Sequence, residues 1–416
     1  MNRDKEYLWH PLTQHKTAAD SKTIVKTEGV YLYDDKGNKY IDGISSWYTA
    51  VYGHRNPVVV DAVKNAMDHM DQVVFTGFTH EPAMKLGEEL LKISPSSMSK
   101  IFFSDNGSTT VDIALKMSLQ YWYNQGLKRT GIIAFDQAFH GDTFGAMSVS
   151  DLDVYNGPFQ EHLLEVNRIE VPNDSNWAKV KEQFASFLKG AMCFIYEPIV
   201  QGAAGMKIYK KDHLNELLSM AKSAGVICIA DEVMTGFGKT GTIFASDQIM
   251  EQPDIICLSK ALTCGMLPMG LTLASEKIYS TFYEQELVKG FFHGHTYSAN
   301  PLACAAALAS IDLIQSDEIK QGIQMIAQSH ESFLQELKGN PKVKNLRSIG
   351  VIFAFEYNIE MERYGTKRNE IYEFFMDRGL YLRPLGNTIY LVPPYIIKKE
   401  ELELLYQGIR DLLSTI

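Results

Sequence analysis

Between about residue 100 and residue 275, short apolar runs alternate with segments of helical periodicity. The apolar runs are KIFFSD, GIIAFDQ, AMCFIYEP, VICIADEV, DIICLSK and LTLASEKI, and the helical segments include STTVDIALKMSLQYWYNQ and KDHLNELLSMAKSAG. Strands that alternate with helices form βαβ units, in which a mostly parallel sheet carries helices on both faces. The sequence therefore predicts an α/β fold with a mostly parallel sheet.

The segments on either side of this region have a different pattern of apolar and polar residues. Residues 29–43 read as a hairpin with a turn at DDKGN, and residues 56–70 and 81–93 have helical spacing. A long helical stretch begins near residue 305, and the last 75 or so residues mix strands and helices. Because 416 residues exceed one compact core, we expect two domains. Residues 56–310 would form the large domain, and residues 1–55 and 311–416 would together form a smaller α+β domain.

The composition excludes several classes of protein. The net charge of −10 disfavours a nucleic-acid-binding protein, which normally carries excess Lys and Arg. The five cysteines form no CxxC pair, and His10, His140 and His293 show no HxxxH spacing, so we expect neither disulfides nor a metal site. The N-terminal residues have no apolar run of the signal-peptide type, and no stretch is long enough to span a membrane. We expect a cytoplasmic protein without membrane contact.

Polar residues end three of the predicted strands. Glu197 follows CFIY, Asp231 ends VICIAD, and Lys260 follows DIICLS, at spacings of 34 and 29 residues. In open α/β sheets, ligands bind beyond the carboxyl ends of the strands, so these side chains are expected at one site rather than as separate strand caps. A desolvated lysine attacks carbonyl groups, and an acid holds a ring nitrogen protonated. Pyridoxal phosphate needs both groups.

A phosphate site is also predicted. The strand ending at Ser104 runs into DNGSTT, residues 105–110, and a helix begins there. Backbone N–H groups at a helix N-terminus bind phosphate well, although the same letters are also typical of an ordinary helix cap. Phe139 and His140, after the next strand, would supply a ring to stack on the cofactor.

Two motifs carry a family resemblance. ADEVMTGFGKTG (residues 230–241) and PDIICLSKALTCG (residues 253–265) resemble the class III pyridoxal-phosphate aminotransferases of fold type I. Other stretches are similar to the branch of that class that converts 8-amino-7-oxononanoate to 7,8-diaminononanoate in biotin biosynthesis. They are WHPLTQ, DGISSWYTAVYGHRNP, FTGFTHEPA, ALKMSLQYW, HGDTFGAMSVSD, EPIVQGAAGM, HGHTYSANPLACAAALASI and RPLGNTIYLVPPYII.

The resemblance implies roles for individual residues. Lys260 would form the Schiff base with the cofactor and carry the proton, and Asp231 would pair with the ring nitrogen. Gly107 and Ser108 would hold the phosphate, and Phe139 would stack on the ring. His295 and Thr296 would contribute to cofactor binding, with Thr296 reaching the phosphate of a neighbouring subunit, so a homodimer with active sites at its interface is implied. The substrate-binding residues implied are Leu12, Trp47, Phe139, Lys260, Gly294, Arg383 and Tyr390, with Arg383 on the substrate carboxylate.

Three positions depart from the family pattern. Leu12 and Phe139 stand where the family usually has aromatic hydroxyls, and Lys239 stands where it usually has arginine. These departures leave the amino donor open, because S-adenosylmethionine is the usual donor and some relatives use lysine. The alternatives are another class III ω-aminotransferase, a racemase or aminomutase on the same fold, and a binding protein without catalysis.

Overall fold

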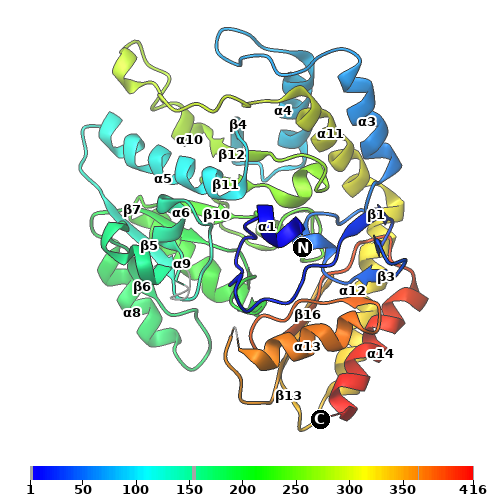
Figure 1. The fold of residues 1–416 in the computed structure, drawn as a ribbon. Helices are drawn as coiled ribbons and strands as arrows, with labels where there is room; N and C mark the ends of the chain where they lie inside the picture. Colours follow the sequence, from blue (N-terminus) through cyan, green and yellow to red (C-terminus); the bar gives the residue numbers. More distant parts are fainter. Residues whose placement is uncertain (1–2, 152–155, 364, 416) are drawn as a thin grey trace.

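The computed structural model describes residues 3–151, 156–363 and 365–415, and is built around a seven-stranded sheet (Figure 1). The strands lie in the order β4 (Met98–Ser104), β12 (Gly270–Ser275), β11 (Ile255–Leu258), β10 (Ile227–Asp231), β7 (Ala191–Tyr196), β5 (Gly131–Phe135) and β6 (Asn167–Ile169). Strand β12 pairs antiparallel with both of its neighbours, and the pairs from β11 to β6 are parallel. The predicted α/β fold with a mostly parallel sheet is confirmed.

Helices cover both faces of this sheet because its strands are buried on both sides. In β10, Ile227 and Ile229 pack in a cluster with helix α5 (Gly107–Asn124). The alternate residues Cys228 and Ala230 pack in the main core with helix α9 (Lys211–Ser223). The remaining elements of this part are α6 (Phe144–Val149), α8 (Trp177–Phe187), α10 (Glu276–Tyr279) and the hairpin of β8 (Val200–Gln201) and β9 (Lys207–Ile208).

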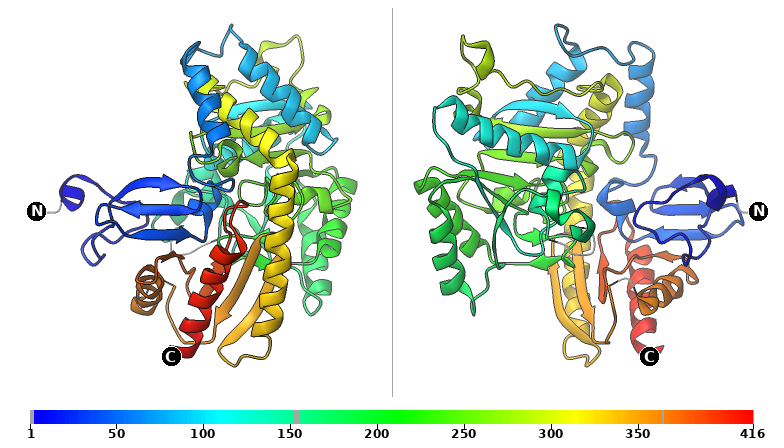
Figure 2. Two further views of the ribbon diagram at one scale, coloured as in Figure 1. Left: turned by 90° about the vertical axis from the view of Figure 1, so that its right-hand side faces the viewer. Right: turned by 60° about the vertical axis from the view of Figure 1, so that its left-hand side comes forward.

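Helices α3 (Pro57–Met67) and α4 (Glu81–Ile93) both pack against α11 (Pro301–Gln315). Helix α12 (Asp317–Leu337) follows directly and is the long yellow helix that runs beside the orange strands in Figure 2. Those strands belong to an antiparallel sheet of β13 (Val343–Ile349), β14 (Ile352–Tyr357) and β16 (Thr388–Leu391). Helices α13 (Thr366–Met376) and α14 (Lys399–Thr415) complete the C-terminal region.

The two ends of the chain meet in one small sheet. The predicted hairpin is present as β2 (Tyr31–Asp34) and β3 (Lys39–Asp42), with β1 (Ile24–Glu28) on its outer side and α1 (Arg3–Tyr7) before it. Strand β15 (Leu380–Tyr381) pairs parallel with β3 and places Leu380 opposite Ile41. This pairing joins segments more than 300 residues apart, as a domain built from both chain ends requires. The domain boundaries themselves stay a prediction.

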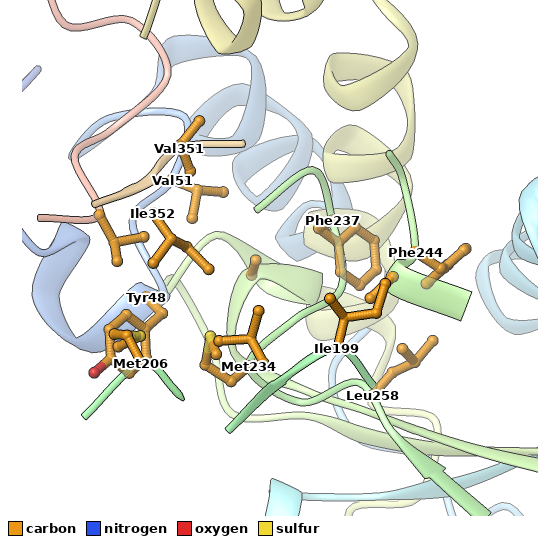
Figure 3. Packing of buried hydrophobic residues seen from close by; sticks show 14 of the residues in the cluster. Tyr48, Val51, Ile199, Met206, Met234, Phe237, Phe244, Leu258, Val351 and Ile352 are labelled. Carbon is orange, nitrogen blue, oxygen red and sulfur yellow. The ribbon is translucent and has the colours of Figure 1, made fainter. Parts of the chain in front are cut away.

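One continuous hydrophobic core connects the terminal segments to the central sheet. Figure 3 shows Tyr48 and Val51 from the N-terminal segment and Ile352 from β14 in one cluster with Met234 and Leu258 of the central region. All of them belong to the same buried cluster. The space beyond the strand ends is therefore enclosed by chain segments from three parts of the sequence.

The five cysteines are all buried, and no disulfide joins them in the described chain. Within the described ranges, no helix is long and apolar enough to cross a membrane, and no group of three or more His, Cys, Asp or Glu side chains could hold a metal ion.

A lysine is buried in this core. The Lys239 side chain is 0% exposed, and its Nζ donates a hydrogen bond to the Gly236 carbonyl at 2.9 Å. Burial, and then the charge of Lys260, lower the Lys239 pKa from its ordinary 10.5 to about 7. A buried ammonium group is costly unless it is well compensated, so the folded protein favours the neutral amine.

This burial predicts a pH-dependent stability. Between pH 7 and pH 10.5 the unfolded chain keeps the Lys239 proton and the folded chain releases it, so stability rises with pH. The contribution has a slope of up to about 1.4 kcal/mol per pH unit. Replacing the amine, as in Lys239→Met, should remove this slope, and urea unfolding at pH 7, 8 and 9 would measure it. Lys85→Met, at an exposed lysine, serves as control. Wild-type and Lys239→Met curves that stay parallel across this range would contradict the account.

Candidate active site

The three predicted polar strand ends share one cavity. Glu197 follows β7, Asp231 ends β10, and Lys260 lies two residues beyond β11. All three line a cavity of about 750 Å³. Strand register explains their proximity, because β10 pairs parallel with β7 on one side and with β11 on the other, with Asp231 opposite Cys257. The carboxyl ends of three neighbouring strands therefore deliver two carboxyl groups and one amine to the same space.

Lys260 has an unusual backbone. Its φ is +50°, in the left-handed region, where a non-glycine residue costs about 1–2 kcal/mol. Two side-chain hydrogen bonds hold the flanking residues: Ser259 Oγ donates to the Met269 carbonyl at 2.7 Å, and Ser310 Oγ donates to the Ala261 carbonyl at 3.0 Å. Strain of this kind persists only where the surroundings enforce it, and it is found at functional sites.

The environment of the Lys260 amine favours its neutral form. Its Nζ lies 5.2 Å from the centroid of the Tyr48 ring. Burial lowers the pKa of Lys260, and the nearby Asp231 and Glu197 offset part of that shift. A neutral amine is both a nucleophile and a proton acceptor.

Asp231 is held by His140, which the sequence predicted at the site only as a ring that could stack on the cofactor. His140 Nδ1 lies 2.7 Å from Asp231 Oδ2, and both side chains are buried. The other carboxylate oxygen, Oδ1, accepts a hydrogen bond from the Val233 N–H at 3.0 Å. His140 Nε2 is buried and has no hydrogen-bond partner among the described residues. The only sequence signal for His140 was its place directly after Phe139.

The helix N-terminus at Gly107 lines the same cavity, together with Ser108. Asn106 caps helix α5 by accepting a hydrogen bond from the Thr109 N–H. Gly141 packs directly on Ser108: its φ is +137°, and a Cβ at this position would lie 2.1 Å from Ser108 Oγ. The loop therefore approaches the helix N-terminus more closely than a residue larger than glycine at position 141 would allow. The free backbone N–H groups of the first turn of α5 remain available to an anion.

Glu197 is buried beneath the cavity. Its carboxyl group accepts hydrogen bonds from the backbone N–H groups of Phe139 at 3.2 Å and Gly202 at 2.9 Å. Burial raises the pKa of Glu197 to about 7, against the lowering effect of His140. Through the Phe139 N–H, this carboxyl group helps to fix the backbone of Phe139, whose side chain lines the cavity.

A left-handed turn forms another part of the cavity wall. The four consecutive residues Ser45, Ser46, Trp47 and Tyr48, which form the short element α2 (Ser45–Tyr48), all have positive φ. Ser45 Oγ anchors this turn by donating to the Val392 carbonyl at 2.7 Å. The turn directs Trp47 to the cavity, where Leu12 also lies.

An adjoining pocket holds Arg383, with Trp47 and Leu12 in both walls. The Arg383 guanidinium carbon lies 5.3 Å from the centroid of the Trp47 ring, within the range of a cation–π contact.

Four residues that the sequence predicted at the site line neither this cavity nor the adjoining pocket in the described chain. Gly294, His295 and Thr296 lie in the segment before α11: His295 Nε2 lies 3.2 Å from Asp105 Oδ2, and the Thr296 carbonyl accepts from Gln72 Nε2. Tyr390 is buried behind Tyr48, whose hydroxyl lies 3.2 Å from that of Tyr390. Lys239 also lies outside the cavity, in the core.

These residues fit pyridoxal phosphate. The cofactor needs an amine for its aldehyde, an acid for its ring nitrogen and a cradle for its phosphate. Lys260, Asp231 and the N-terminus of α5 supply them around one cavity. The buried, unpartnered Nε2 of His140 is a polar atom left over behind the acid, as expected of a charge network that a bound group completes.

Comparison with known proteins agrees with this geometry. The family model for aminotransferase class-III matches residues 14–413. The adenosylmethionine-8-amino-7-oxononanoate aminotransferase of Synechococcus elongatus is 42% identical over 99% of both chains, and that of Helicobacter pylori is 35% identical over 99% of this chain and 97% of its own.

Solved structures have the same fold. The crystal structure of the enzyme of that name from Methanocaldococcus jannaschii superimposes with a TM-score of 0.92 at 34% identity, covering 98% of both chains. An amine transaminase from an uncultivated Pseudomonas species, solved in its PLP-bound form, gives a TM-score of 0.91 at 28% identity over 97% of both chains. With Lys260 and Asp231 at the strand ends and a helix N-terminus beside them, this chain belongs to the class III aminotransferases, whose cofactor is pyridoxal phosphate.

Proposed function

We propose that this aminotransferase converts 8-amino-7-oxononanoate to 7,8-diaminononanoate in biotin biosynthesis, with S-adenosylmethionine as amino donor. The observation that carries the proposal is a cavity with reactive groups that adjoins a pocket with a carboxylate-binding group. Lys260 and Asp231 line the cavity, and Trp47, which lines both spaces, leads to Arg383 in the pocket. The names of relatives up to 42% identical over nearly the whole chain support the same substrate.

The reactive groups of the cavity handle one proton. Bound pyridoxal phosphate supplies an electron sink for the carbon that loses this proton. Lys260, whose pKa burial lowers, accepts the proton from the substrate Cα and returns it at the cofactor C4′. Asp231 keeps the ring nitrogen protonated, and His140 holds Asp231 in place from behind. The same amine serves both half-reactions.

The adjoining pocket selects the substrate. Arg383 offers a planar pair of donors that matches a carboxylate. Leu12 and Trp47 provide an apolar wall for the carbon chain between the carboxylate and the reacting carbon. Phe139 stacks on the cofactor ring, a task that needs no hydroxyl group.

A homodimer completes the site in this proposal. Gly294, His295 and Thr296 lie outside their own chain's cavity, so they would act on the cofactor and substrate of the partner subunit. The large apolar side chains of Leu287, Val288, Phe292 and Tyr297 in the same segment are exposed in the single chain. Contiguous exposed apolar side chains mark interaction surfaces. The five unpaired cysteines support a reducing compartment such as the cytoplasm.

The donor is the part of the proposal with a specific alternative. Leu12 and Phe139 both line the cavity, at positions where the family usually has an aromatic hydroxyl. Phe139 is the one beside the cofactor. Lysine is therefore the second candidate donor, with the same acceptor.

A donor screen tests the proposed function. Purified holoenzyme is mixed with 8-amino-7-oxononanoate and either S-adenosylmethionine or lysine, and diaminononanoate is measured by mass spectrometry. We expect product with S-adenosylmethionine and none from Lys260→Ala, which lacks the proton carrier. If product forms with lysine and not with S-adenosylmethionine, lysine is the amino donor. If neither donor gives product and the protein still aminates other keto compounds, then 8-amino-7-oxononanoate is not its substrate.

The His140 contact predicts a positioning effect. His140→Ala should lower kcat by about 10²-fold, because Asp231 loses the partner that orients it. His140→Asn should recover part of the rate, since its amide can still donate to the carboxylate. The pH titration of the cofactor absorbance provides an independent measurement, because the protonation that it follows at the Lys260 nitrogen responds to the charge on the ring nitrogen. A purely structural role would lower the melting temperature and leave this titration unchanged.

A further inference from the structure

Besides Arg383, two further arginines, Arg363 and Arg368, line the small pocket next to the main cavity. The other residues around it are Leu12, Trp47, Pro384, Leu385 and Gly386. None of these lining residues is acidic, so the pocket concentrates positive charge between apolar walls. Such a pocket has the chemistry of a carboxylate site.

Arg363 differs from Arg383 in its position. It lines both this pocket and the main cavity that contains Lys260, whereas Arg383 lines the small pocket alone. Arg363 precedes α13, in a segment where the sequence reading assigned no functional residue. Its guanidinium group therefore lies at the junction of the two spaces, on the path that a chain with one end at Lys260 would follow to Arg383.

The hydrogen bonds of Arg363 leave a donor free. Nη2 donates to the Ala203 carbonyl at 2.6 Å, which fixes the guanidinium plane. Nε is buried and has no hydrogen-bond partner within the described part of the chain. No carboxylate of the described residues forms an ion pair with Arg363 or Arg383. A buried guanidinium N–H without a partner is costly, and a ligand oxygen removes that cost.

The loop of Gly386 lies beside Arg363. The φ of Gly386 is +60°, and a Cβ there would lie 3.5 Å from Arg363 Cα. The loop of Gly386 follows Arg383 by three residues, so one turn positions the backbone beside both arginines.

We propose that Arg363 is a second substrate-binding residue, which together with Arg383 holds the carboxylate of the acceptor. The Arg363 guanidinium donates to one carboxylate oxygen, and Arg383 donates to the other. The pair selects a long-chain acid over a neutral chain of equal length, because an uncharged end forms no charge-assisted hydrogen bond with either guanidinium group. The inference deepens the proposed function and rests on it for the identity of the acceptor.

Binding of nonanoate to the holoenzyme tests this inference without turnover. Nonanoate has the length and carboxylate of the acceptor but neither its amine nor its ketone, and nonanamide is its neutral counterpart. Isothermal titration calorimetry compares wild type with Arg363→Gln. We expect the Kd for nonanoate to rise about 10- to 100-fold, as for the loss of a charge-assisted hydrogen bond. The Kd for nonanamide should stay within about twofold.

Lys367→Gln is the matched control. It removes one positive charge from an exposed residue of the same segment that does not line the pocket, so solvent screening should limit its effect on nonanoate to about twofold. Arg363→Lys keeps the charge without the planar fork and should bind nonanoate with intermediate affinity. It also serves as the test variant if Arg363→Gln fails to fold.

An unchanged nonanoate Kd in Arg363→Gln, or an equal loss for nonanoate and nonanamide, would overturn the inference. In turnover of oxononanoate, the variant should raise KM by a similar factor and leave kcat within about threefold. Wild-type enzyme that ignores oxononanoate while Arg363→Gln still loses nonanoate affinity would contradict the proposed function alone. Normal turnover with unchanged nonanoate affinity would contradict the role of Arg363 alone.

Discussion

The parallel pairing of β10 with β11 is the constraint on which the rest of the site depends. It places Asp231 opposite Cys257, three residues before Lys260, so the acid and the amine emerge side by side at the sheet edge. The pairing of β10 with β7 then adds Glu197 on the other side of Asp231. A one-residue slip of either strand would turn its side chains to the opposite face, and burial on both faces prevents such a slip.

Burial also provides the chemistry. The same apolar layers that hold the strands in register desolvate Lys260 and Glu197, which lowers the pKa of the amine and raises that of the carboxyl group. The left-handed backbone at Lys260 and the left-handed turn at Trp47 are both strained segments of the cavity wall. Hydrogen bonds from Ser259, Ser310 and Ser45 to main-chain carbonyls hold these segments in place. The stability of the core thus maintains a strained, partly desolvated site.

The sequence predicted the features that follow from local pattern. The alternation of apolar runs and helices gave the sheet, and the polar residues at the strand ends gave Glu197, Asp231 and Lys260. Features that depend on long-range contacts could not be read in this way. His140 reaches Asp231 across 91 residues, and Arg363 reaches the cavity from a loop without periodicity. Tyr390, by contrast, was predicted at the substrate site and lies outside it. Its motif gave no sign that Tyr48 would lie between Tyr390 and the cavity.

The central claim is that Lys260, and no other lysine, reacts with the cofactor. Borohydride reduction of the holoenzyme followed by peptide mass spectrometry tests it directly, since reduction fixes the cofactor covalently to the lysine that holds it. The account predicts the added mass on the peptide that contains Lys260, and none on the peptide that contains the buried Lys239. Modification of Lys239 or of any other lysine, or the absence of a modified peptide from protein that carries the cofactor, would contradict it.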